Sequence, residues 1–112
     1  MIQQNIVTLG PGDDFIQKYK VDFQQGAIVA SIIPVSDDEQ TQVKASYAAK
    51  LMWSNNDKFY VKEPICDLKR TKSSGESLVT STQAVYSAIS VHNYEAIPQK
   101  YYISLYVPGT AT

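Results

Sequence analysis

Apolar and polar residues alternate along much of this chain with a period of two. In the longest run, Val43 to Ser54, apolar side chains occupy the odd positions and mostly polar or small ones the even positions. Successive side chains of a strand point to opposite faces, so this alternation predicts a strand with one buried and one wetter surface. The same pattern recurs at residues 15–23 and 101–107. It predicts a mostly antiparallel β domain.

A helix competes with a strand over residues 41–53. This segment contains Ala, Lys, Leu and Met, which all favour helices, and Ser36 with Glu39 has the spacing of a helix capping box. The unbroken alternation of six apolar positions favours the strand, and the helix is left open as the alternative.

Turn signals divide the chain into about seven expected strands. Gly10–Asp14 and Ser54–Asp57 are the strongest turns, while residues 27–35 predict a central strand and residues 64–77 predict a long, mobile loop. Leu78 to Tyr94 predicts one bent strand or two shorter ones. These elements indicate an all-β, antiparallel β-sandwich or a jelly-roll-like domain.

Length places residues 1–112 in a single domain, because 112 residues lie close to the usual domain size. The first nine residues are expected to form a strand or a short N-terminal arm. Residues 109–112 are expected to be a frayed C-terminal tail.

The charge and composition of the chain limit the classes of binding partner that we expect. Charged residues make up only 19% of the chain, against 44% hydrophobic, and the net charge is −1. The single basic cluster, Lys69, Arg70 and Lys72, is too small for the stripe that neutralises several phosphates, so nucleic-acid binding is not expected. No signal peptide or membrane-spanning run is recognisable, so we expect no membrane partner.

The residues that could carry chemistry are few. His92 is the only histidine, and although Ser90 could join it in a Ser-His-acid triad, no Gly-x-Ser-x-Gly motif accompanies it. Cys66 is the only cysteine, and the neighbouring Asp67 would raise its thiol pKa, so a buried structural thiol is favoured. We therefore expect no catalytic residue and no enzyme activity.

Two acidic clusters, Asp13-Asp14 and Asp37-Asp38-Glu39, lie in expected loops. Their carboxylates could contribute to a calcium cage, but neither has the alternating spacing of an EF-hand. Solvated turn residues are the favoured interpretation. We accordingly expect no metal site and no cofactor.

Eight tyrosines are the remaining signal. Exposed tyrosine can stack on sugars, anchor a protein interface or cover the second face of a sandwich. Aromatic residues are enriched at interfaces whereas Lys and Glu are depleted, which favours protein contacts. The candidate interface residues are Tyr60, Tyr86, Tyr94, Tyr102 and Tyr106.

These features together favour a structural or assembly protein. It would bind copies of itself and a larger structural protein, as a phage capsid decoration or tail-associated virion component assembled in the host cytoplasm. The alternative is a small carbohydrate- or ligand-binding β-sandwich, although Trp53 falls on the apolar side of its strand and is expected in the core. A small enzyme that uses His92 is the least favoured hypothesis.

Overall fold

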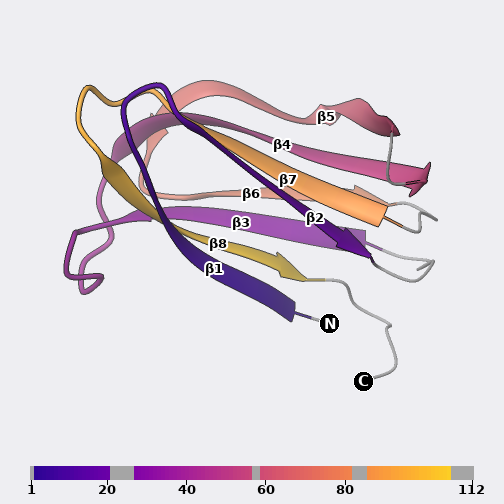
Figure 1. The fold of residues 1–112 in the computed structure, drawn as a ribbon, viewed down its shortest axis with the longest axis horizontal. Coiled ribbons are helices and arrows are strands. Elements are labelled where there is room, and N and C mark those ends of the chain that lie inside the picture. The colour runs from indigo at the N-terminus through magenta and orange to yellow at the C-terminus, as the bar shows by residue number, and fades with distance from the viewer. Residues whose placement is uncertain (1, 21–26, 57–58, 82–85, 107–112) are drawn as a thin grey trace.

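Two antiparallel sheets packed face to face make up the fold (Figure 1). The computed structural model describes residues 2–20, 27–56, 59–81 and 86–106. These residues form eight strands: β1 (Ile2–Leu9), β2 (Asp14–Lys20), β3 (Ala27–Val35), β4 (Ala45–Asn56), β5 (Phe59–Ser73), β6 (Glu76–Ser81), β7 (Tyr86–Asn93) and β8 (Gln99–Tyr106).

The strand order is that of a jelly roll. One sheet has the order β1-β8-β3-β6 and the other has the order β2-β7-β4-β5. Strands β1 and β8, β2 and β7, β3 and β6, and β4 and β5 pair antiparallel, which is the pattern of one long hairpin rolled over on itself. The β-sandwich or jelly-roll expectation is confirmed, with eight strands in place of about seven.

The core lies between the sheets and is formed by the inward side of the alternating pattern. Along β8, Tyr101, Ile103 and Leu105 are fully buried while Tyr102 and Ser104 face outward. The rings of Tyr101 and Tyr47 meet edge to face in this core, with centroids 5.6 Å apart. Trp53, which was also expected there, has its side chain outside the described part of the structure.

Residues 45–53 belong to strand β4, so the strand interpretation of this segment is confirmed and the helix is wrong. Strand β4 lies between β7 and β5 and pairs with both. Tyr47, Ala49 and Leu51 are buried, as the alternation requires. Ser36 and Glu39 form a loop instead of a helix start, with a hydrogen bond from the Glu39 amide to the Ser36 carbonyl at 2.8 Å.

The mobile loop expected at residues 64–77 is wrong. Residues 64–73 complete strand β5, and β6 begins at Glu76 after a turn of two residues. Proline is tolerated there because β5 is an edge strand, where a missing N–H need not break a ladder. The register also jumps between Lys50↔Asp67 and Met52↔Lys62, so the extra β5 residues around Pro64 form a bulged section.

The N-terminal segment is a strand and not an arm, because Ile2–Leu9 pairs with β8 along its whole length. The turn expected after it is confirmed: the Asp13 amide donates to the Gly10 carbonyl at 3.1 Å, and Gly12 has a positive φ of 77°. Within residues 78–94, the described residues 78–81 belong to β6 and residues 86–93 form β7, so the two-strand alternative is confirmed. The tail at 109–112 lies outside the described residues.

Among the described residues, no helix has the length and hydrophobicity needed to cross a bilayer.

Candidate functional site

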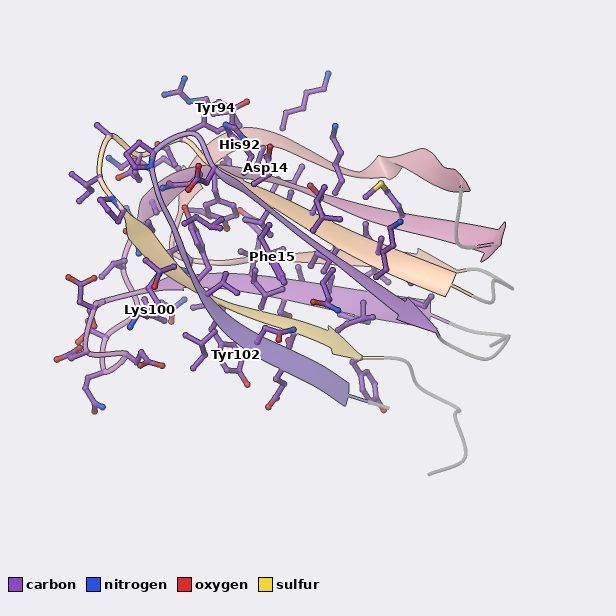
Figure 2. The ribbon with its side chains drawn as sticks, in the orientation of Figure 1. Asp14, Phe15, His92, Tyr94, Lys100 and Tyr102 are labelled. Carbon is purple, nitrogen blue, oxygen red and sulfur yellow. The ribbon has the colours of Figure 1, made fainter. Side chains whose placement is uncertain are left out.

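A hollow of about 360 Å³ lies on the outer face of the β2-β7-β4-β5 sheet. Figure 2 shows three of its residues, Asp14, His92 and Tyr94, gathered on that side of the sandwich, while Tyr102 lies on the opposite side. The residues that line it come from all four strands of this sheet and from Tyr94, which directly follows β7. They are Asp14, Ala48, Ala49, Lys50, Lys69, Arg70, Ser90, His92 and Tyr94.

The small side chain of Ala48 makes room for this hollow. The register places Asp14 beside His92 on one flank and Ala48 beside His92 on the other, so the three form one row across β2, β7 and β4. In the next row Ser90 lies opposite Lys50. Because directly opposed residues of neighbouring strands project to the same face, larger side chains surround the methyl group of Ala48 and leave a depression above it.

A bulge in β5 brings two basic side chains to the same hollow. Tyr47 pairs with Thr71 and Ala49 pairs with Leu68, so two residues of β5, Lys69 and Arg70, lie opposite the single residue Ala48. In a regular strand, neighbouring residues point to opposite faces, but a bulge re-aims one of them. Lys69 and Arg70 consequently both line the hollow.

Asp14 and His92 are hydrogen-bonded across β2 and β7. The Nδ1 atom of His92 lies 2.6 Å from Oδ1 of Asp14, and the two side chains are 31% and 58% exposed. An ionised carboxylate only accepts hydrogen bonds, so Nδ1 carries the proton and donates it. In the neutral imidazole, Nε2 is then left as an acceptor.

Tyr94 lies between His92 and the basic side chain of Arg70 and contacts both. Its ring meets the ring of His92 edge to face, with centroids 4.4 Å apart, and the Arg70 guanidinium carbon lies 4.8 Å from the centre of the same tyrosine ring. A guanidinium over an aromatic face is attracted by the ring quadrupole. Tyr94 therefore holds both neighbours in place.

Asn93 supports the site from below. Its side chain is fully buried and its Nδ2 donates to the carbonyls of Leu9, Gly10 and Ile97 at 2.9, 3.1 and 3.2 Å. Its Oδ1 accepts from the Glu95 amide and the Tyr101 hydroxyl. Asn93 thus ties the turn before Asp14 to the loop that carries Tyr94. The sequence analysis missed it, although a polar residue following Ile89 and Val91 on the buried side of β7 was a visible signal.

The five candidate interface tyrosines do not gather on one surface. Tyr94 lines the hollow, whereas Tyr102 and Tyr106 project from the outer face of the other sheet. The side chains of Tyr60 and Tyr86 lie outside the described part of the structure. The interface assignment therefore stays a prediction, and it divides between two faces.

The described residues of the hollow do not form a hydrogen-bonded Ser-His-acid triad. Ser90 lies on the same face of β7 as His92 and lines the same depression, but in the part of the chain that the structure describes no hydrogen bond joins the two side chains. Asp14 and His92 therefore form a pair that can bind and orient a polar ligand, without an attached nucleophile.

In the acidic cluster Asp37-Asp38-Glu39, the carboxylates of Asp38 and Glu39 make contacts within the protein. The Ser36 hydroxyl donates to Asp38 at 2.5 Å and the Gln40 amide donates at 3.0 Å, and these bonds lower the pKa of Asp38. The Lys100 ammonium lies 3.6 Å from Glu39. Among the described residues, no three His, Cys, Asp or Glu side chains are grouped so that they could hold a metal ion.

Neither a protein-family model nor a curated protein matches this chain. Solved structures do share its fold. A pre-peptidase C-terminal domain of a Bacillus anthracis collagenase is similar with a TM-score of 0.61 and 11% identity, over 93% of this chain and 88% of that one. The Yersinia pseudotuberculosis-derived mitogen has a TM-score of 0.57 and 10% identity, over 100% of this chain and 90% of the mitogen.

A third similar structure is chitosan-binding module 1 of a chitosanase/glucanase from Paenibacillus sp. IK-5. Its TM-score is 0.51 at 12% identity, over 91% of this chain and 76% of the module. At such low identity the likenesses establish the fold, a β-sandwich. None of the three is a virion component, so the virion role expected from the sequence stays a hypothesis without support from them.

Proposed function

We propose that this protein is a saccharide-binding β-sandwich module and that the hollow around Ala48 is its binding site. The hollow itself carries the proposal. Its volume of about 360 Å³ falls within the range of small-molecule sites, roughly 300–1,000 Å³. Its lining offers hydrogen-bond donors and acceptors together with one tyrosine ring.

The kind of lining favours a sugar over an apolar ligand. Asp14 offers carboxylate oxygens, the imidazole of His92 is oriented by that carboxylate, and Ser90 supplies a hydroxyl. Sugar hydroxyl groups both donate and accept hydrogen bonds, so they can satisfy this mixed set. The fold adds support, because it is also the fold of a chitosan-binding module.

The role proposed is binding and not catalysis. No described serine is hydrogen-bonded to the Asp14–His92 pair, and recognition of a sugar needs only positioned polar groups. The pair then offers hydrogen-bond acceptors and a donor to the sugar hydroxyl groups in fixed positions. This assignment corresponds to the alternative that the sequence analysis placed second.

Filling the hollow tests the proposal. Wild-type protein is screened on an oligosaccharide array, and the best ligand is titrated by calorimetry into wild type, Ala48→Phe and Ser104→Phe. Ser104 lies on the outer face of the other sheet, so its replacement is the matched control. We expect Ala48→Phe to weaken binding at least tenfold and Ser104→Phe to leave it unchanged. No saccharide binding by wild type, or equal binding by all three, overturns the proposal.

Protein assembly is the second candidate function, and a different surface favours it. On the outer face of the β1-β8-β3-β6 sheet, Ile6 is 50%, Val79 50% and Tyr106 46% exposed. The register places Ile6 opposite Tyr102, which is opposite Ile33 in turn, so apolar side chains continue across three strands. Exposed apolar patches of this kind mark interaction surfaces.

Light scattering tests the assembly candidate. The solution mass of wild type is compared with that of the double variant Tyr102→Ser, Tyr106→Ser, with far-UV circular dichroism as the folding control. A wild-type oligomer that becomes a folded monomer in the variant supports a self-association surface. A wild-type monomer at high concentration contradicts it.

A further inference from the structure

The charge on the hollow is opposite in sign to that of the whole chain. Among the described side chains that line it, three are basic, those of Lys50, Lys69 and Arg70, and one is a carboxylate, that of Asp14, so these four carry a formal charge of +2 when His92 is neutral. The whole chain has a net charge of −1. The described lining of this depression therefore carries an excess of positive charge, whereas the chain as a whole does not.

These cations are available to a ligand. In the part of the chain that the structure describes, neither of the ion pairs involves Lys50, Lys69 or Arg70, and the only carboxylate of the hollow is bonded to His92 at 2.6 Å. The bulge in β5 places Lys69 and Arg70 on the same side, opposite Ala48. An anion entering the hollow therefore meets positive groups that form no ion pair with any other described residue.

Arg70 is the group best prepared to hold an oxyanion. Its guanidinium lies over the Tyr94 ring at 4.8 Å, which restricts its orientation before any ligand arrives. The planar guanidinium fork matches the two oxygens of a carboxylate, and such bidentate bonds are among the strongest in proteins. The two lysines add charge without that geometric match.

We infer that the ligand is an acidic saccharide, and that Arg70 binds the carboxylate of one of its uronic acid residues inside the hollow. This inference rests on the proposed saccharide-binding function and adds the substrate class. The Asp14–His92 pair then faces the hydroxyl groups of the same sugar. A polymer with positively charged amines, such as chitosan, has the opposite charge to the one that this hollow favours.

A matched pair of ligands tests the inference. Tetragalacturonate and its fully methyl-esterified form have the same sugar rings, but only the first carries carboxylates. Both are titrated by calorimetry into wild type, Arg70→Ala, Arg70→Lys and Lys44→Ala. Lys44 is exposed and does not line the hollow, so Lys44→Ala removes the same charge elsewhere.

We expect wild type to bind tetragalacturonate at least tenfold more tightly than the ester. Arg70→Ala should lose about tenfold to 100-fold of that affinity, because hydrogen bonds to charged groups are worth about 1.5–3 kcal/mol. Arg70→Lys should be intermediate and Lys44→Ala unchanged, with far-UV circular dichroism showing that all variants fold. The difference between the two ligands should also shrink as salt is raised.

Three outcomes contradict the inference in different ways. Equal binding of acid and ester overturns the acidic-sugar inference but leaves saccharide binding intact. Displacement of tetragalacturonate by an equal concentration of inorganic phosphate shows a general oxyanion site and likewise overturns it. Binding of neither tetragalacturonate nor its ester overturns it as well, and if the oligosaccharide array is also negative, the proposed function fails with it.

Discussion

Replacing Asn93 should destabilise the domain more than any exposed polar substitution. The side chain is fully buried and makes five hydrogen bonds, three through Nδ2 and two through Oδ1. Two of its partners are themselves buried in these bonds, the Leu9 carbonyl and the Tyr101 hydroxyl. Asn93→Ala removes every side-chain bond and leaves those two buried groups without their partner.

The magnitude follows from the groups left without partners. A buried polar group that loses its hydrogen bond costs about 1–3 kcal/mol, so the two enclosed groups together cost about 2–6 kcal/mol. Domains of this size have unfolding free energies of about 5–15 kcal/mol. The loss is therefore a large fraction of the total, and it also loosens the turn before Asp14 and the loop at Tyr94.

Urea unfolding of wild type and three variants measures this loss. For a urea slope of about 2 kcal/mol per molar, a loss of 2 kcal/mol lowers the midpoint by about 1 M. Asn93→Asp preserves the size of the side chain but sets an oxygen against three carbonyls, so it should be at least as destabilising as Asn93→Ala. Gln17→Ala is the exposed control, expected within 0.5 kcal/mol of wild type, about the usual range for surface changes. A loss below about 1 kcal/mol in both Asn93 variants refutes the reasoning.

Three further predictions concern the stability of the fold. Burial raises the pKa of Tyr101 and of Tyr47 above the ordinary value of 10.0, so these tyrosines ionise first in the unfolded chain. The free energy of unfolding should therefore hold below about pH 10 and fall as pH rises above it, by at most about 1.4 kcal/mol per pH unit for each tyrosine. Unfolding titrations from pH 8 to 12 measure this slope, and Tyr101→Phe should flatten it. Tyr47→Asp should unfold the domain, as seen by circular dichroism, because it places a carboxylate in the core. Lys50→Glu, on the outward side of the same strand, should change the free energy of unfolding by under about 0.5 kcal/mol. Equal tolerance at both positions contradicts the assigned faces. Gly12→Ala should cost about 1–2 kcal/mol, because φ is +77° although no atom lies near the added methyl group, and an unchanged urea midpoint contradicts this.

The strands with clean alternation were predictable from the sequence. In β8 from Tyr101 onward and in residues 45–52 of β4, every second side chain is buried, and the buried ones are apolar, for example Tyr47, Leu51 and Ile103. Periodicity succeeds there because a strand with one buried face imposes a period of two. Strand β5 failed the same test, because an edge strand with bulges tolerates Pro64 and charged residues that resemble a loop.

The site was much less predictable than the fold. Asp14 and His92 are 78 residues apart and meet only because β2 pairs with β7. The common face of Lys69 and Arg70 depends on a bulge, which no spacing rule in the sequence announces. What the sequence did contain was the short basic cluster itself, but its spacing did not announce that Arg70 would lie beside Tyr94.

Mapping a bound saccharide onto the two outer faces tests the central claim most directly. The measurement is a ¹H–¹⁵N correlation spectrum of the labelled protein titrated with the best oligosaccharide ligand. We expect the largest shifts at Ala48, Ser90 and Tyr94, and small shifts at Tyr102 and Ser104 on the opposite sheet. Shifts concentrated on the opposite sheet, or no shifts at millimolar saccharide, contradict the claim.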